Sequence, residues 1–164
     1  MREYGAGYGR SPGSISRVKP EERVQRTSTD KDGKRNGGPY WELSKSIIAA
    51  FYTVKLELGS GFPEYVYANA MVVALRRLGI RALREVPYEV VFYGVVVGLF
   101  RADLVVEDKI LVETKVARVI VGAHREQMWH YLHAAKRPVG LILNFGDRAG
   151  TARVEVPEFI DPHA

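Results

Sequence analysis

The stretch that decides the fold is Ile110-Leu111-Val112-Glu113-Thr114-Lys115-Val116. Because side chains alternate along a strand, Glu113 and Lys115 share one face with Leu111. The other residues are as apolar as those of a strand buried on both faces, so two charges here cost free energy unless a metal ion, a partner charge or a substrate compensates. We interpret the pair as part of a functional site; an exposed salt bridge on a sheet face is the alternative.

A second acid-x-lysine triplet, Glu107-Asp108-Lys109, lies in the polar turn just before this strand, where charges stay solvated. If the turn spans these three residues, Val106 lies opposite Ile110, and counting back sets Asp103 opposite Glu113. Directly opposed residues project to the same side of a sheet, with Cβ atoms about 5 Å apart. Two carboxylates so close need a cation between them or a shared proton, and an all-oxygen site suits Mg²⁺ or Mn²⁺.

Two helices are predicted ahead of these strands. Residues 43–58 place one apolar stripe at helical spacing, formed by Leu43, Ile47, Phe51, Val54 and Leu58, and this helix ends at Gly59. Pro63 suits the first position of a second helix, whose buried face is predicted to consist of Val66, Ala70, Val73, Ala74 and Leu78. Gly79 followed by Ile80 predicts a Schellman stop, with Ile80 packing back on the last turn.

Strands dominate the rest of the chain. Residues 86–97 predict a hairpin that turns at Tyr93 and Gly94. Further strands are predicted at 101–106 and 110–117, then a helix at 123–135, a buried strand at 139–145 and an edge strand at 151–156. Three or four antiparallel strands therefore precede the third helix, and with four the order is α-α-β-β-β-β-α-β-β. We expect an α/β fold over residues 41–158, a mixed β-sheet flanked by helices, with a frayed end at 159–164.

The composition separates an N-terminal segment from this domain. Residues 1–40 hold nine Lys or Arg against five Asp or Glu, so most of the net charge of +5 belongs to them. They are rich in Gly, Ser and Pro and poor in aliphatic residues, which predicts a disordered basic tail. Such a tail could hold nucleic acid weakly by counterion release; a merely solvated tail is the alternative.

Two absences narrow the function classes. The chain has no cysteine, which excludes disulfides, thiolate zinc sites, iron–sulfur clusters and cysteine nucleophiles. No apolar run approaches the length needed to cross a bilayer, so we expect a soluble, cytoplasmic protein without a membrane partner.

Four further polar residues are candidates for the same site. Glu64 falls in the first turn of the second helix, where the helix dipole favours a carboxylate, and Tyr67 follows at i+3. The alternative is that Glu64 only improves the helix start and that Tyr67 packs at its surface. Gln127 and Tyr131 stand at i and i+4 of the third predicted helix and so project together.

These residues add up to a family resemblance. Gly61-Phe62-Pro63-Glu64-Tyr65-Val66-Tyr67 matches the pattern GxxExxY, and Ile47 to Phe145 resembles the GxxExxY proteins, a branch of the PD-(D/E)XK nuclease superfamily. The motif order agrees: Leu78-Gly79-Ile80, Glu85-Val86-Pro87, Asp103-Leu104-Val105-Val106, Glu113-Thr114-Lys115, Gln127 with Tyr131-Leu132, and Gly140-Leu141 to Asn144-Phe145-Gly146. Two departures are Val54-Lys55, where the family often has Val-His, and Gly59-Ser60-Gly61, where it has Gly-Pro-Gly.

The resemblance implies Mg²⁺ held by Asp103, Glu113 and Glu64, with the backbone carbonyl of Thr114 as a further ligand. It implies that Lys115 orients or activates the attacking water, and that the metal and desolvation lower the pKa of this lysine. Gln127 and Tyr131 look like the QxxxY helix of RecB-like nucleases, which supports the site and touches the nucleic-acid backbone.

The expected function is a nuclease that uses Mg²⁺ or Mn²⁺ to hydrolyse phosphodiester bonds of DNA with a metal-activated water. A catalytically silent nucleic-acid-binding or scaffold protein on the same fold is the alternative, since a fold does not fix activity. A small-molecule hydrolase has little support because the sequence contains no nucleophile elbow, phosphate loop or zinc motif. Nucleic acid is the expected partner, and a homodimer is left open.

Overall fold

The computed structural model describes residues 37–160; the predictions for residues 1–36 and 161–164 lie outside that range. The elements, in chain order, are α1 (Trp41–Leu58), α2 (Glu64–Arg77), β1 (Ala82–Phe92), β2 (Val95–Val106), β3 (Ile110–Lys115), α3 (Gly122–Ala135), β4 (Val139–Asn144), β5 (Gly150–Glu155) and a 3₁₀ turn (Pro157–Phe159). No helix among these has the length and hydropathy needed to cross a membrane.

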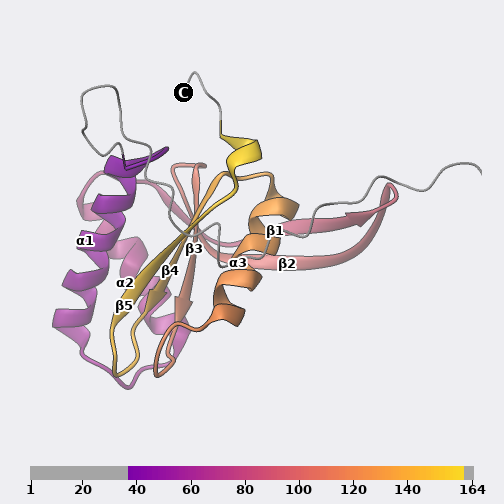
Figure 1. Cartoon of the computed structure of the whole chain (residues 1–164). Coiled ribbons are helices and arrows are strands. Elements are labelled where there is room, and N and C mark those ends of the chain that lie inside the picture. Colours follow the sequence, from indigo (N-terminus) through magenta and orange to yellow (C-terminus); the bar gives the residue numbers. More distant parts are fainter. Residues whose placement is uncertain (1–36, 161–164) are drawn as a thin grey trace, which may run out of the picture.

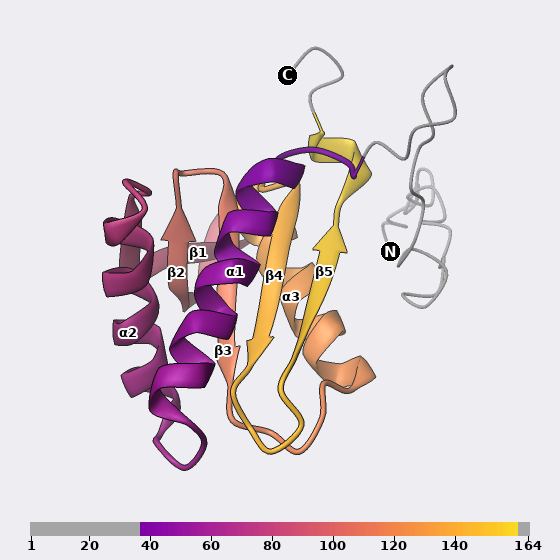
Figure 2. The same ribbon diagram turned by 90° about the vertical axis from the view of Figure 1, so that its left-hand side faces the viewer.

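The five strands form one mixed sheet in the order β1-β2-β3-β4-β5, and the predicted α/β fold with a mixed sheet flanked by helices is confirmed. Only β3 and β4 run parallel, and α3 makes the crossover between them. α1 and α2 pack on one side of the sheet and α3 packs on the other (Figures 1 and 2). The sheet is therefore the middle of three layers, and β3 is its central strand.

The deciding stretch is a buried central strand. Ile110, Leu111 and Val112 are almost completely buried, the even-numbered residues in the core under α1 and α2 and Leu111 in the core under α3. The turn after β2 has the predicted length, because Val106 pairs with Ile110 and Val105 with Leu111. The predicted register of β2 against β3 is confirmed.

The strand count before α3 is corrected. The predicted break between residues 97 and 101 does not exist, and β2 is one strand from Val95 to Val106. Gly98 pairs with Val90 inside the ladder, and the register shifts beside it, between Val90 and Val91. A bulge thus absorbs the glycine, which often marks such irregularities, so three strands precede α3 instead of four.

The predicted buried face of α2 was only partly right: Ala70 and Ala74 do pack against the core. Val73 and Leu78 are exposed, whereas Tyr67, Met71 and Leu75 are the residues that face the core. The predicted and the observed core-facing residues both repeat at helical spacing. Tyr67 favours the observed face, because its ring can be buried there while its hydroxyl makes hydrogen bonds to the preceding loop. The Schellman stop after α2 is confirmed: the Ile80 N–H donates to the Leu75 carbonyl at 3.0 Å.

Candidate functional site

Glu113 and Lys115 lie on the face of β3 that looks toward α3, and they contact each other. The Lys115 Nζ donates a hydrogen bond to Glu113 Oε1 at 2.9 Å, and the two side chains are only 16% and 12% exposed. The pair is therefore much less exposed than a surface salt bridge.

Asp103 reaches β3 from the neighbouring strand. Leu104 pairs with Val112, so one further step sets Asp103 level with Glu113. Asp103 Oδ2 accepts hydrogen bonds from the Thr114 N–H at 2.8 Å and from the Thr114 hydroxyl at 2.6 Å. One carboxylate oxygen thus fixes Asp103 against the strand, while no hydrogen bond among the described residues involves the other.

Glu64 is brought to the end of β3 by the start of α2. Its Oε1 accepts a hydrogen bond from the Val116 N–H at 3.0 Å. This contact joins the first residue of a helix to the residue that follows the strand, and it sets a third carboxylate beside Glu113. The three acids come from three separate elements, α2, β2 and β3.

Burial and the neighbouring acids raise the proton affinity of Glu113. The pKa of Glu113 is raised from 4.5 to about 7, mainly by burial and next by the charge of Asp103, with a smaller contribution from Glu64; Lys115 opposes the rise. Repulsion between nearby carboxylates is what a bound cation would relieve. The protonated form of Glu113 is therefore favoured more strongly than that of an exposed carboxyl group.

The pKa of Lys115 moves upward in the metal-free protein. Burial lowers it, but the hydrogen bond to Glu113 and the charges of Glu113, Glu64 and Asp103 outweigh burial and raise it above 10.5. The lowered pKa expected for the metal-loaded site is thus not present here, and Lys115 is a cation at neutral pH.

The carboxylate oxygens of the site have the chemistry that a hard divalent ion prefers. Their positions, however, do not form a coordination site. Asp103, Glu113 and Glu64 supply carboxylate oxygens, the ligands that Mg²⁺ and Mn²⁺ prefer. Within residues 37–160, however, no three Asp, Glu, His or Cys side chains converge closely enough to hold a metal ion. Glu113 is turned to Lys115 and each of the other acids to a backbone N–H, so metal binding requires side-chain rotation.

Gln127 and Tyr131 of α3 contact each other as predicted. The Gln127 Nε2 donates to the Tyr131 hydroxyl at 2.9 Å. The Tyr131 ring stacks on Phe100 of β2 at 4.1 Å between ring centroids, and Phe100 stacks on Tyr88 of β1. This aromatic row joins α3 to the base of the β1–β2 hairpin.

Tyr67 takes a different place from the one expected. It is completely buried and stacks on Phe145, with 4.4 Å between ring centroids. Its hydroxyl donates to the Gly59 carbonyl at 2.9 Å and accepts from the Phe62 N–H at 3.2 Å. Tyr67 therefore fixes the loop between α1 and α2, which leads into Glu64 at the start of α2, and it is not exposed to a substrate.

Two structural residues beside the site were not predicted. Asn144, at the end of β4 and paired with Lys115, is fully buried and makes four hydrogen bonds to the loops after β3 and β4. Lys55 of α1 donates to the carbonyls of Phe145 and Gly146 at 2.7 and 3.0 Å and also contacts the Ser60 hydroxyl. In the sequence, Asn144 stands out only as a single amide at the end of an otherwise apolar strand. Lys55 stands out only because the resembled family often has histidine at this position.

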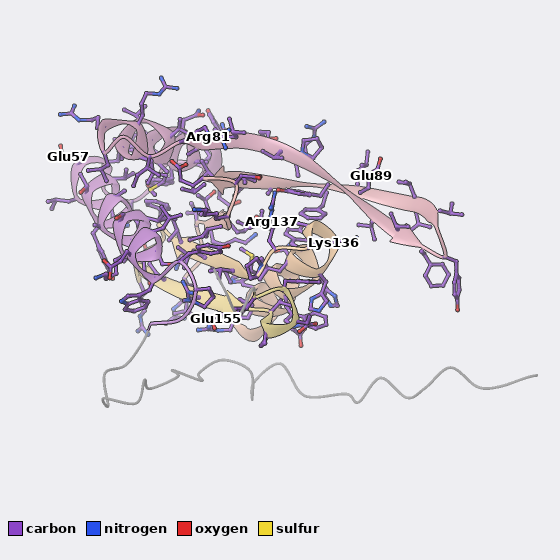
Figure 3. All side chains as sticks on the ribbon, turned by 90° about the horizontal axis from the view of Figure 1, so that it is seen from above. Glu57, Arg81, Glu89, Lys136, Arg137 and Glu155 are labelled. Carbon is purple, nitrogen blue, oxygen red and sulfur yellow. The ribbon has the colours of Figure 1, made fainter. Side chains whose placement is uncertain are left out.

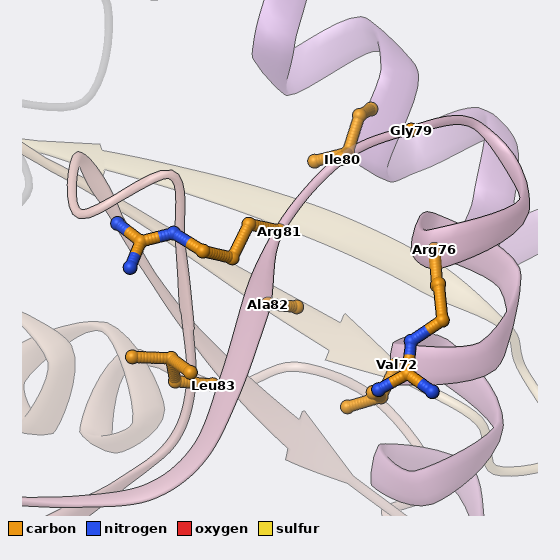
Figure 4. A pocket seen from close by; sticks show the side chains of 7 residues that line it. All are labelled: Val72, Arg76, Gly79, Ile80, Arg81, Ala82 and Leu83. Atoms are coloured by element: carbon orange, nitrogen blue, oxygen red, sulfur yellow. The ribbon is translucent and has the colours of Figure 1, made fainter.

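A hollow lined by two arginines lies elsewhere. A cavity of about 370 Å³ between the end of α2 and the start of β1 is lined by Arg76 and Arg81 among apolar residues, without a carboxylate (Figure 4). It is at the opposite end of α2 from Glu64, and the two guanidinium groups point apart (Figure 4). This cavity is therefore separate from the acidic site.

The pKa of Glu113 predicts how stability depends on pH. Its folded value of about 7 lies above the ordinary 4.5, so its contribution to stability is complete below pH 4.5 and is lost as the pH rises toward 7. In a chelator, the free energy of unfolding of wild type relative to Glu113→Gln should fall by up to about 3 kcal/mol across this window. Urea unfolding at pH 4.5, 6 and 8 measures it; a difference that stays constant would contradict the raised pKa.

A family model and a solved structure are similar to this chain. The family model described as the PD-(D/E)XK nuclease superfamily matches residues 41–155. The solved structure described as the crystal structure of SSO0001 is similar, with 21% sequence identity and a TM-score of 0.44 over 76% of this chain. The match spans only 62% of that chain's length. No curated protein matches the sequence.

Proposed function

Since the chain belongs to the PD-(D/E)XK nuclease superfamily, we propose that it is a metal-dependent nuclease whose site consists of Asp103, Glu113, Lys115 and Glu64. The observation that carries the proposal is the buried Glu113–Lys115 pair level with Asp103. A structural ion pair would need only one acid; here the charges of Asp103 and Glu64 also act on the pair, and burial together with these charges raises the pKa of Glu113.

The chemistry assigned to each group follows from its contacts. Asp103, Glu113 and Glu64, with the Thr114 carbonyl, would hold Mg²⁺ or Mn²⁺. A divalent ion so held would stabilise charge on the phosphoryl oxygens and promote ionisation of a water molecule. Lys115 is protonated and partly buried, which suits it to orient the attacking water and to stabilise negative charge as that water displaces one ester oxygen from phosphorus.

The finer assignments belong to the same proposal. We infer that the chain is a GxxExxY-type protein of the RecB-like branch and that its substrate is DNA. Gln127 and Tyr131 would contact the DNA backbone. The inferred location is the cytoplasm. Gln127 and Tyr131 support this reading because their hydrogen bond holds both polar groups together on the side of the sheet where Glu113 lies. A catalytic domain over residues 41–158 completes it; Pro39 and Tyr40, which the sequence assigned to the tail, already contact this domain, through Arg153 and the core under α1 and α2.

A cleavage assay tests the function. Single-stranded, duplex and branched DNA, and RNA of the same sequence, would be incubated with the protein and Mg²⁺, Mn²⁺ or excess chelator. We expect DNA fragments in both metals and none in chelator. Absence of cleavage in every arm, together with metal-independent DNA binding, would favour the alternative of a silent binding or scaffold protein.

Metal binding can be tested without any substrate. The wild-type protein should gain about 3 kcal/mol of stability at a Mn²⁺ concentration 100 times the dissociation constant, because the ion binds only the folded state. Asp103→Asn should gain much less, as it loses one charged ligand, while Asp108→Asn in the exposed turn should respond like wild type. Thermal melting over a metal titration measures these shifts; equal responses from Asp103→Asn and wild type would reject the site.

A further inference from the structure

The β1–β2 hairpin carries a long apolar arm that extends beyond the body of the protein. The arm, defined as Val90 to Leu99, projects past α3 (Figures 1 and 3). None of its ten residues is charged, and Phe92, Tyr93 and Leu99 are 61%, 88% and 69% exposed. Valines on both faces of the ribbon are also exposed, at positions 90, 91, 95, 96 and 97.

This exposure reaches the upper end of the range for monomeric proteins. A fully buried aromatic side chain removes about 150–250 Å² from water, and at these exposures the arm presents on the order of 600 Å² of apolar surface. The largest apolar patch on a typical monomer is about 300–600 Å². Two unsupported strands are also marginally stable in water, so the arm gains stability from any surface that covers it.

The chemistry of the arm restricts its partner. Nucleic-acid contacts are made mostly to phosphates, and the arm has no Lys or Arg to make them. Insertion into lipid hydrocarbon would leave the unpaired backbone groups of a two-stranded ribbon without hydrogen bonds. A protein surface with a matching apolar hollow remains the best fit.

The same chain offers such a hollow at the base of the arm. A cavity of about 390 Å³ lies between arm and helix, lined by Val90, Val91, Phe100, His130, Tyr131 and Ala134 among others. A protruding apolar tip and an apolar hollow on one chain are the two halves of a self-complementary, twofold-symmetric contact. The apolar surface of one arm is also close to the roughly 800 Å² that each partner buries in a standard interface.

We propose that two copies of this chain associate through their arms, with Phe92 and Tyr93 of each copy packing into the hollow beside α3 of the other. Tyr131 lines this hollow and accepts the hydrogen bond of Gln127, so the contact places the partner's tip next to the residues proposed to touch the substrate. The association itself does not depend on the proposed nuclease chemistry, because it is measured without substrate.

Sedimentation equilibrium of the full chain tests the proposal. Wild type should have the mass of two chains at micromolar concentration. Phe92→Glu and Ala134→Glu, which set a charge on the tip and in the hollow, should each raise the dimer dissociation constant by at least about 100-fold. Leu56→Glu, an equally drastic change at an 84% exposed position of α1, should leave it unchanged. Circular dichroism melting of each variant separates loss of association from loss of fold.

Three results would overturn the proposal. One is a wild-type monomer at high micromolar concentration. Another is a dimer that Phe92→Glu dissociates but Ala134→Glu does not, which would remove the hollow from the contact. The third is flotation of a monomeric wild type, but not of Phe92→Glu, with phosphatidylcholine vesicles, which would assign the arm to a lipid surface.

Discussion

Replacing Lys115 with Met should reduce metal-dependent cleavage by about 10²–10⁴-fold, the range in which a positioned proton-transfer or charge-stabilising group contributes. Met keeps much of the side-chain volume but removes the cation, so Glu113 loses its 2.9 Å partner and the attacking water loses its orienting group. Glu113→Gln should reduce cleavage at least as strongly, because it removes a metal ligand and the partner of Lys115 together. Single-turnover cleavage at saturating Mg²⁺ measures both.

The chain supplies its own matched controls for these variants. Glu107 and Lys109 repeat the acid-x-lysine spacing in the turn between β2 and β3, but Lys109 is exposed and Glu107 accepts a hydrogen bond from the Arg81 N–H. Lys109→Met and Glu107→Gln should retain cleavage within a few-fold of wild type. If Lys115→Met and Lys109→Met lost activity equally, the proposed role of Lys115 would be wrong, and a general effect of charge on substrate binding would explain both.

The sequence predicted the centre of the sheet because local rules are strong there. A three-residue turn between apolar strands admits one register, and this register sets Asp103 level with Glu113. The stop after α2 was likewise marked by local residues, Gly79 and Ile80. Each of these features depends on contacts within a few residues of one another in the chain.

Features that depend on distant contacts could not be predicted. The buried side of α2 was set by Tyr67, whose hydroxyl partners and stacking partner come from the preceding loop and from Phe145. The apolar run from Val90 to Leu99 has the composition of a buried hairpin, yet within residues 37–160 no element covers it. The apolar composition of a segment determines how strongly its burial is favoured. Whether another part of the chain covers the segment depends on the tertiary arrangement.

Asn144→Leu should destabilise the protein by about 3–5 kcal/mol, a value typical of a buried hydrogen-bond network left partly unsatisfied. The Asn144 Oδ1 accepts from the N–H groups of Ala117 and Gly146, and its Nδ2 donates to the carbonyls of Ala117 and Arg148. Leu has similar volume but can replace none of these bonds. Urea unfolding in chelator measures the loss, with Asn69→Leu as the control, because Asn69 makes one exposed bond to Arg84.

The same substitution should also weaken the site, because Asn144 pairs with Lys115 across the parallel strands and joins the two loops that leave β3 and β4. These loops touch closely: a Cβ added at Gly146 would lie 2.0 Å from the Ala117 carbonyl oxygen. Without the amide, the end of β3 is free to move, and with it the Val116 N–H that holds Glu64. The Mn²⁺ dissociation constant of Asn144→Leu should therefore rise about tenfold or more, in a fold still native at low temperature. An unchanged dissociation constant beside a large loss of stability would mean that Asn144 supports the fold without positioning the acids.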